Sequence, residues 1–406
     1  MSIKKTLLSL ILTLTVSVSA AIPVYAVNIA SECDISDIDV PIEVSNIKTD
    51  IGESLEIKAK SAVLMEVSTG EILYEKEPDL LVPPASITKI MSLLLIMEAI
   101  ENKQFSLEDV CTASEHAASM GGSQIWLKEN ESMTVDDLLK AAVIASANDA
   151  TVALAEKVAG SEEGFVALMN KKAKELGLLK TTFKNATGLD ADGHLSSAHD
   201  VAVMSRELIK HDLIKRYSTV WMESLRGGET ELVNTNKLIR FYEGATGLKT
   251  GTTSGAGYCL SATAEREGLS LVAVVMSGDT SADRFSSARK LLDFGFSNYK
   301  VKTVAIDKKE LGGAKVLGGT EKTVKPQTPE IVPLLLKKSD DDQTKTTVTY
   351  KENLKAPLTA GDKIGVLQIK RGEETLYTTD LLAEKDIKKR TVLTVFLSIF
   401  KSLFIP

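Results

Sequence analysis

The feature that most constrains the fold is a change of pattern along the chain, from strands to helices and back to strands. Residues 61–76 have the alternation of a hairpin around Gly70, and a strongly apolar helix is expected over residues 86–102. Two further strands are expected at 257–264 and 269–277. A chain that returns to strands after a helical middle is typical of a sheet with helices packed beside it.

Within the middle, hydroxyl side chains mark where helices begin. Thr134, Ser161 and Ser197 each precede a helical pattern whose first turn they can cap, and Gly177 suits the end of the second helix. A last helix is expected over residues 284–293. The middle of the chain is therefore mostly helical.

The pattern changes again after Gly295. Short β-favouring runs alternate with Gly, Pro and charged turns, at residues 303–306, 330–336, 345–350 and 363–369. This spacing predicts a small all-β sandwich domain of about ninety residues, over 296–385.

Residues 1–26 have the composition of an export signal. Lys4 and Lys5 precede an uncharged run over residues 7–21, and small or apolar residues favour cleavage after residue 26. A retained membrane anchor is the alternative, but the run is shorter than the roughly 20 residues that a span needs. The acidic residues 27–55 show no periodicity, which indicates a linker.

The terminal residues 386–406 are expected to form an amphipathic helix. A basic cluster comes first, and polar residues then recur at intervals of three and four: Thr391, Thr394, Ser398, Lys401 and Ser402. The apolar run is short for a membrane span but suits a helix that lies in the headgroup region of anionic lipid. A core helix and a dimer contact are the alternatives.

Charge and composition exclude several classes of protein. The formal net charge is -7, with 48 Lys and Arg against 55 Asp and Glu, so the chain lacks the basic field of a nucleic-acid binder. The 3 cysteines and 4 histidines show none of the spacings of a metal site. Neither a metal nor a cofactor is implied.

Three short patterns carry residue types suited to acyl transfer: Ser86-Ile-Thr-Lys89, Ser146-Ala-Asn148 and Lys249-Thr-Gly251. Ser-x-x-Lys alone is weak evidence because further copies occur in the chain, whereas Ser-x-Asn and Lys-Thr-Gly each occur once. The copy at Ser86 differs from the others because it opens a strongly apolar helix behind two prolines.

A base must activate a serine, because the hydroxyl is a poor nucleophile until it loses its proton. Lys89 lies three residues after Ser86, so on a helix the two side chains share one face. A free lysine has a pKa near ~10.4, and burial beside the second ammonium of Lys249 is expected to lower it. Ser146 can relay a proton to a leaving amine, and Asn148 can orient the lysine and a substrate amide.

The third pattern suits substrate binding. Lys249 and Thr250 supply a cation and a hydroxyl for a substrate carboxylate, and Gly251 allows the substrate to lie close to strand backbone. The amide hydrogens of Ser86 and Thr252 are candidates for an oxyanion hole.

In this order, the three patterns resemble those of the penicillin-recognising serine acyltransferases. The phrases around them are similar to those of low-molecular-mass D-alanyl-D-alanine carboxypeptidases, at residues 81–92, 145–150, 234–238, 247–253 and 257–260. The resemblance runs from about residue 56 to 385. It implies an α/β (α+β) catalytic domain of the transpeptidase and β-lactamase type over 56–295, the β-rich domain behind it, and a membrane anchor in the terminal helix.

The resemblance also implies roles for the residues. Ser86 matches the acyl-ester nucleophile and Lys89 its general base, Ser146 and Asn148 match the second active-site element, and Lys249 matches the site for the substrate carboxylate and for β-lactams.

Two positions leave the binding of the terminal carboxylate open. Arg284 matches an arginine that some members have near this carboxylate, and the alternative is a helix-start arginine without a special partner. Thr252 stands where several members carry His, Phe or Tyr. We expect His194, which lies in a phrase of the family, and Cys259 to be structural.

Three other functions use related residues. A class A β-lactamase needs a glutamate four residues before an asparagine, and no glutamate after Asn148 has this spacing. A D,D-endopeptidase that cuts peptidoglycan cross-links uses the same trio and stays open. A non-catalytic penicillin sensor or wall-binding protein is disfavoured by the complete trio.

The sequence thus predicts an exported serine carboxypeptidase attached peripherally to the outer face of the cytoplasmic membrane. Its substrates are expected to be peptidoglycan stem pentapeptides, from which it removes the last D-alanine through an acyl-enzyme. β-Lactam antibiotics are expected to be covalent inhibitors.

Overall fold

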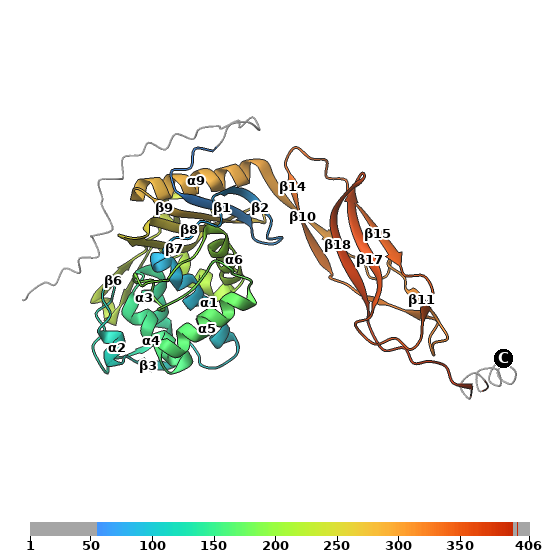
Figure 1. The fold of residues 1–406 in the computed structure, drawn as a ribbon, viewed down its shortest axis with the longest axis horizontal. Coiled ribbons are helices and arrows are strands. Elements are labelled where there is room, and N and C mark those ends of the chain that lie inside the picture. Colours follow the sequence, from blue (N-terminus) through green and yellow to red (C-terminus); the bar gives the residue numbers. More distant parts are fainter. Residues whose placement is uncertain (1–54, 393–395, 397–406) are drawn as a thin grey trace, which may run out of the picture. The chain divides into compact units, whose positions relative to one another are not determined.

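The first part of the molecule is built on a five-stranded antiparallel sheet with the order β2-β1-β9-β8-β7 (Figure 1). The structure is a computed structural model that describes residues 55–392 and residue 396. Two strands precede the helical middle and three follow it: β1 Ser61–Glu66, β2 Ile72–Lys76, β7 Ala245–Thr253, β8 Gly257–Arg266 and β9 Leu269–Gly278. β1 pairs with both β2 and β9, which confirms the hairpin around Gly70 and the predicted sheet.

The sheet is covered on both faces. Along β9, Val272 and Val274 belong to the core shared with the helical middle, whereas Leu271 and Ala273 belong to a second core on the side of α9 (Ser281–Asn298). Because successive side chains of a strand point to opposite faces, one continuous apolar run serves both cores.

The helical middle also carries two small hairpins. Its helices are α1 Lys89–Glu101, α2 Glu115–Ala118, α3 Val135–Ile144, α4 Asn148–Ala159, α5 Glu162–Glu175, α6 Ala198–Ile209, α7 Asp212–Ser218 and α8 Leu238–Phe241. The hairpins are formed by β3 Val110–Thr112 with β4 Ser132–Thr134, and by β5 Met222–Leu225 with β6 Thr230–Val233. Figure 1 shows α9 along one face of the sheet and α1, α3, α4 and α5 on the opposite side.

The predicted helix starts are confirmed at three positions. The hydroxyls of Thr134, Ser161 and Ser197 accept hydrogen bonds from backbone N–H groups three residues on, at the first turns of α3, α5 and α6. Each bond satisfies an N–H group that the helix itself cannot, and such a cap contributes about 1 kcal/mol.

The helix expected from residue 86 begins later than its apolar pattern suggests. Residues Ala85–Thr88 form a 3-10 turn, closed by a hydrogen bond from Ile87 N to Pro84 O at 3.1 Å, and α1 starts only at Lys89. The tighter turn matters for the site because it carries Ser86.

The last helix of this part is longer than predicted. α9 continues through Gly295 to Asn298, so the expected domain boundary at residue 295 falls inside it. Gly295 packs closely against the sheet within this helix, since a Cβ there would lie 2.5 Å from Leu271 Cδ1. β10 begins at the next residue, Tyr299.

The remaining part is a small all-β domain, as predicted. Its strands are β10 Tyr299–Ala305, β11 Ala314–Leu317, β12 Thr323–Val324, β13 Pro326–Gln327, β14 Ile331–Lys337, β15 Lys345–Tyr350, β16 Leu354–Lys355, β17 Lys363–Arg371 and β18 Glu374–Ala383. They form sheets with the orders β10-β14, β12-β11-β16 and β13-β18-β17-β15. Alternating apolar residues of β14 and β17 supply much of a separate core.

The prediction of a helix from residue 386 is wrong for its first residues. Ile387 is 1% exposed and pairs with Leu358 in an isolated bridge, and Lys389 pairs with Gly319. These residues are extended because Ile387 fills the core of the β domain. In the terminal segment, Val392 and Phe396 are helical and exposed.

The other predictions for the chain ends fall outside the described residues. They are the export signal over 1–26, nearly all of the linker over 27–55, and the rest of the terminal helix. Among the residues that the structure does describe, no helix has the length and apolar character needed to cross a membrane.

Candidate active site

The proposed nucleophile and base are in contact. Ser86 lies in the 3-10 turn and Lys89 is the first residue of α1, so the turn brings the two side chains to one side. Lys89 Nζ lies 3.0 Å from Ser86 Oγ, and the Lys89 side chain is fully buried. The pair predicted from the three-residue spacing is thus within hydrogen-bonding distance.

Two further oxygen atoms fix the direction of the Lys89 amine. Nζ donates to Asn148 Oδ1 at 2.6 Å and to the backbone oxygen of Thr187 at 2.9 Å. A neutral amine has two N–H bonds and one lone pair. If Asn148 and Thr187 accept the two hydrogens, the lone pair points to Ser86 Oγ, as a general base requires.

The second predicted pair lies in the turn between α3 and α4. Ser146 is buried and has a positive φ of 62°, and Asn148 begins α4. Asn148 Nδ2 donates to Gly121 O at 2.6 Å, so the amide cannot rotate and its oxygen faces Lys89. The turn therefore holds one amide between the lysine and the segment at Gly121.

The next residue anchors this turn. The Asp149 carboxylate is buried and accepts hydrogen bonds from the backbone N–H groups of Ile125 and Leu127. Burial raises the pKa of Asp149 above its ordinary value. Asp149 joins α4 to the segment that carries Gly121, and sequence reasoning assigned it no role.

The third pattern lies on β7, the edge strand of the sheet, directly beside the serine turn. A Cβ on Gly251 would lie 3.0 Å from Pro84 O and 3.1 Å from Ile87 N. Glycine lets the strand lie this close to the backbone around Ser86, because a side chain would press against Pro84 and Ile87. The backbone at Gly251 and the nucleophile are therefore immediate neighbours.

The flanking side chains of β7 are buried. Lys249 is 1% exposed and its Nζ donates to Thr250 O at 2.9 Å. Thr250 Oγ1 donates to Thr235 Oγ1 at 2.7 Å. Thr235 belongs to a phrase that resembles the family, but its contact with Thr250 was not predicted.

Arg284 is not the unpartnered helix-start arginine of the alternative interpretation. It is buried in the first turn of α9, and its Nη1 donates to Thr252 Oγ1 at 2.9 Å and to Gly251 O at 3.3 Å. Its guanidinium carbon lies 5.3 Å from the centre of the Tyr258 ring and 5.0 Å from that of Phe285. Arg284 thus supports the end of β7 from behind.

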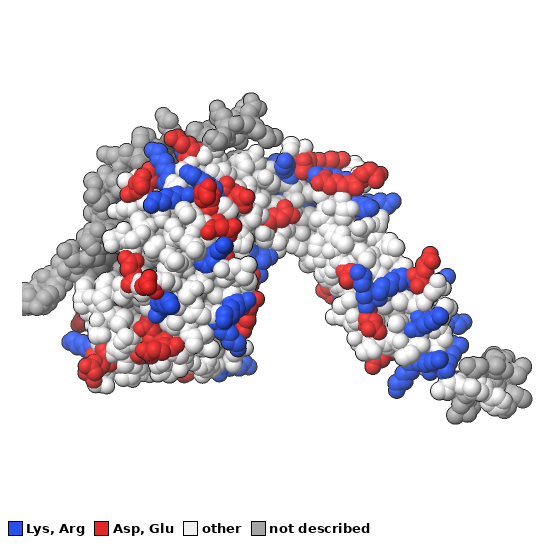
Figure 2. Space-filling view, in the orientation of Figure 1, with Lys and Arg blue, Asp and Glu red and all other residues white. Residues whose placement is uncertain are grey.

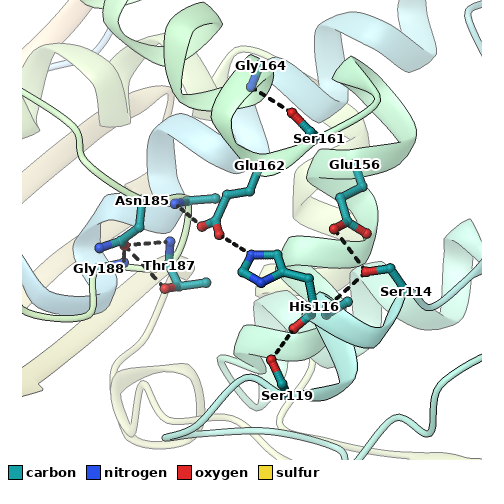
Figure 3. Close-up of polar contacts among 12 residues, drawn as sticks. Ser114, His116, Ser119, Glu156, Ser161, Glu162, Gly164, Asn185, Thr187 and Gly188 are labelled. Carbon is teal, nitrogen blue, oxygen red and sulfur yellow. Dashed lines mark hydrogen bonds and ion pairs between the residues drawn. The ribbon is translucent and has the colours of Figure 1, made fainter.

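Sequence reasoning missed the segment that supplies the Thr187 oxygen. Asn185 Oδ1 accepts hydrogen bonds from Thr187 N at 3.1 Å and from Gly188 N at 2.7 Å (Figure 3). Gly188 has a φ of 92°, and a Cβ there would lie 1.8 Å from Ala85 O. Asn185 and Gly188 are residue types that favour turns, but a backbone acceptor for Lys89 leaves no mark in the sequence.

His194 and Cys259 lie where the structural interpretation expects them. His194 Nδ1 accepts a hydrogen bond from Lys184 N at 3.1 Å, so its Nε2 carries the hydrogen that faces Thr88 Oγ1 at 2.8 Å. Burial lowers the pKa of His194 to about 4, and burial raises the pKa of the Cys259 thiol to about 11. Within residues 55–392, no group of three or more His, Cys, Asp or Glu side chains is arranged to bind a metal ion.

Comparison with known proteins identifies the family of the chain. A family model described as D-alanyl-D-alanine carboxypeptidase matches residues 48–280, and one described as the C-terminal domain of penicillin-binding protein 5 matches residues 299–389. The D-alanyl-D-alanine carboxypeptidase DacF of Bacillus subtilis is 44% identical over 341 residues, which cover 83% of this chain and 88% of that protein.

Solved structures share the fold. Penicillin-binding protein 5 from Haemophilus influenzae is 30% identical with a TM-score of 0.75, and the match covers 83% of this chain and 99% of that one. Penicillin-binding protein D2 from Listeria monocytogenes, solved in an ampicillin-bound form, is 33% identical with a TM-score of 0.55, and the match covers 60% of this chain and 100% of that one. The chain belongs to the D-alanyl-D-alanine carboxypeptidase family of serine peptidases.

Proposed function

We propose that the protein removes the terminal D-alanine from peptidoglycan stem pentapeptides, with Ser86 as nucleophile. The observation that carries this proposal is the buried Lys89 amine, 3.0 Å from Ser86 Oγ and bound by two acceptors on its other sides. An amine held in this way needs no rearrangement to take the serine proton, which is the advantage of a preorganised site.

Acylation begins when Lys89 accepts the proton of Ser86. The Ser86 oxygen forms a bond to the penultimate carbonyl carbon, and the carbonyl oxygen takes up negative charge that the N–H groups of Ser86 and Thr252 stabilise. The amide C–N bond then breaks, and Ser146 passes a proton to the leaving amine of D-alanine while it takes one back from Lys89. Water cleaves the resulting ester and restores the serine, so the net reaction is hydrolysis.

The substrate carboxylate is bound at the end of β7. Lys249 supplies a cation, Thr250 supplies a hydroxyl, and Gly251 allows the peptide to lie along the edge strand. Because Arg284 Nη1 already donates to Thr252 Oγ1, the Thr252 hydrogen is directed elsewhere and is available to the carboxylate. Arg284 therefore acts through Thr252. In this way a threonine can bind the carboxylate at a position where several relatives carry larger residues.

The same steps explain inhibition by β-lactams, whose strained amide acylates Ser86 in place of the peptide. Fast release of this ester requires a second base of the β-lactamase type, and no glutamate after Asn148 has the spacing of that base. The penicilloyl ester is therefore expected to be long-lived, and nitrocefin turnover at ordinary enzymatic rates would contradict this part of the proposal.

The test of the reaction is digestion of purified muropeptides. Release of free D-alanine from monomeric pentapeptides is expected, with the Ser86→Ala variant inactive. Conversion of cross-linked dimers to monomers without release of D-alanine would instead identify a D,D-endopeptidase. Binding of wall material without cleavage of either substrate would identify a sensor or wall-binding protein.

For the location of the protein, we propose export and peripheral attachment to the outer face of the cytoplasmic membrane. The support is the sequence of residues 1–26 and 391–406, together with the exposed Lys385, Lys388, Lys389 and Arg390 before the terminal segment. Figure 2 shows Lys and Arg side chains gathered at one end of the β domain. Cations beside an apolar helix favour an anionic lipid surface.

A further inference from the structure

One carboxylate that is not among the proposed catalytic residues binds the segment 185–188. In this segment, Thr187 O accepts a hydrogen bond from Lys89. Glu162 lies in the first turn of α5, and its side chain is 12% exposed. Its Oε1 accepts a hydrogen bond from Ala186 N at 2.8 Å, and its Oε2 lies 2.6 Å from His116 Nε2 (Figure 3). Glu162 therefore joins three elements of the helical middle: α2, α5 and the segment 185–188.

The segment is held from its other side by α1. Ala186 O accepts from Ser92 Oγ at 2.6 Å, and Thr187 O accepts from Lys89 Nζ at 2.9 Å. Ser92 and Lys89 are three residues apart and lie on one face of α1. The backbone of Ala186 and Thr187 thus lies between the face of α1 that carries the base and the Glu162 carboxylate.

We infer that Glu162 is a positioning residue that fixes the Thr187 carbonyl, and through it the direction of the Lys89 lone pair, while His116 holds the carboxylate in place. This inference rests on the proposed function, because it concerns how the same lysine acts as a base. Displacement of the segment turns an acceptor away from Nζ, and the amine then loses the constraint that directs it to Ser86 Oγ.

The charges around the pair are consistent with this role. The hydrogen bond to Glu162 raises the pKa of His116, and the neighbouring carboxylates of Glu162, Glu156 and Glu163 act in the same direction. Glu156 itself accepts from Ser114 Oγ at 2.9 Å, so it is bound to the cap of α2 and not to the segment 185–188. Glu162 is the carboxylate that accepts from the segment's backbone.

The chain supplies a matched control. Glu163 is the next residue in the same turn of α5, so it has the same charge and the same favourable position near a helix N-terminus, but it is exposed. A purely structural role for an acidic side chain at this helix start would affect Glu162 and Glu163 alike. A role in positioning Lys89 would affect Glu162 alone.

The experiment measures acylation of the full mature chain by benzylpenicillin, resolved into the dissociation constant of the initial complex and the first-order rate constant of acylation. For Glu162→Ala, we expect this rate constant to fall between about tenfold and a hundredfold, the effect of a small misplacement of a catalytic group, with the dissociation constant unchanged. Glu162→Gln keeps an acceptor for Ala186 N and is expected to restore most of the rate. Glu163→Ala is expected to match the wild type.

A double-mutant cycle tests whether His116 acts by holding the Glu162 carboxylate in place. His116→Ala is expected to lower the acylation rate constant less than Glu162→Ala does, and to have no further effect in the Glu162→Ala background. An equal loss in both backgrounds would show that His116 does not act through Glu162. Glu162→Gln and His116→Ala both keep an acceptor at position 162 for Ala186 N. They therefore replace Glu162→Ala in the experiment if that variant does not fold.

Failure of this inference is distinguishable from failure of the proposed function. If the wild type is acylated at Ser86 and Glu162→Ala reacts with the same rate constant, Glu162 does not position the base and the proposed function stands. If the wild type is not acylated at all, the proposed function is wrong. A loss confined to the dissociation constant would also overturn the inference, because it would assign Glu162 to binding.

Discussion

At the scale of single residues, the site depends on where each hydrogen of one amine is directed. Lys89 Nζ lies within 3.0 Å of Ser86 Oγ, Asn148 Oδ1 and Thr187 O. Asn148 is itself held by Gly121 O, and Thr187 by the Asn185 side chain. The base is therefore oriented by groups that are each fixed by a further hydrogen bond.

Lys89→Arg tests whether this amine acts as a base. A guanidinium stays protonated at any pH that the protein tolerates, so the variant cannot accept the Ser86 proton. Loss of a general base lowers a rate by about 10²–10⁴-fold, and we expect labelled penicillin to react at least this much more slowly. Lys171→Arg, at an exposed position of α5, is the control. Near-normal labelling of Lys89→Arg would show that Lys89 only orients the serine.

His194 leads to a prediction about stability and pH. Burial lowers its pKa to about 4 in the folded protein, from an ordinary value of 6.5. Between these values the unfolded chain binds a proton that the folded protein does not, so stability falls as the pH falls through this window. The full loss is about 3 kcal/mol from this group.

The measurement is urea unfolding of the wild type and of His194→Gln from pH 7 to pH 4. Glutamine keeps a donor and an acceptor but does not titrate. We therefore expect the wild type to lose up to about 3 kcal/mol more than the variant over this range. Equal losses for the two proteins would show that His194 titrates normally.

At this scale, the sequence alone indicates side chains but not backbone partners. Ser86, Lys89 and Asn148 could be grouped from their spacing and chemistry, and the structure brings them into contact. Thr187 could not be found, because its contribution is a carbonyl oxygen that any residue possesses. Glu162 could not be found either, because it faces a segment more than twenty residues away.

At the scale of elements, the site depends on two close backbone approaches to the 3-10 turn Ala85–Thr88. One is Gly251 on β7 and the other is Gly188 in the segment that supplies the Thr187 oxygen. A Cβ on Gly188 would lie 1.8 Å from Ala85 O, and the positive φ of 92° is itself unfavourable for other residues. The turn is thus held between a strand and a loop.

Gly188→Ala is expected to push the segment away from this turn. Gly177→Ala is the matched control, because Gly177 also has a positive φ, 72°, but its Cβ would meet no atom within 4 Å. The control measures backbone strain alone, about 1 kcal/mol. We expect Gly188→Ala to lower the melting temperature further and to slow penicillin acylation, whereas Gly177→Ala leaves acylation unchanged. Equal effects of the two substitutions on acylation would contradict this account of the loop.

Most elements could be predicted where a capping side chain marks the helix start, as at Thr134, Ser161 and Ser197. α4 could not, because its N-cap is Ala147, which has no side-chain hydrogen bond to give. The 3-10 form of the turn at Ser86 was also missed, since the apolar pattern of α1 continues through it. Local pattern alone does not separate a tight turn from the first turn of a helix.

At the scale of the whole molecule, the described residues form separate hydrophobic cores. The catalytic part has cores on both faces of its sheet, and the β domain has its own, completed by Ile387. The short β-favouring runs after Gly295 predicted the division into a catalytic domain and a β domain. They did not predict the residues at which the β domain begins and ends. The limits depend on Gly295 packing inside α9 and on Ile387 filling the β core, which are both tertiary contacts.

Membrane attachment is tested by ending the chain at Arg390, which keeps Ile387 and Lys389 in the β domain. We expect the mature chain from residue 27 to sediment with vesicles that contain anionic lipid, and the shortened chain to stay in solution with its penicillin acylation unchanged. Equal sedimentation of both chains would contradict a terminal anchor. A change from dimer to monomer, without any effect on vesicle binding, would identify the segment as a dimer contact.

The central claim is that the Ser86 hydroxyl, activated by Lys89, forms the acyl-enzyme, and mass spectrometry of the benzylpenicillin adduct tests it most directly. The account predicts one penicilloyl group per chain, on the peptide that contains Ser86, and none on the Ser86→Ala variant. An adduct on another serine, or an adduct that persists in Ser86→Ala, would contradict the account.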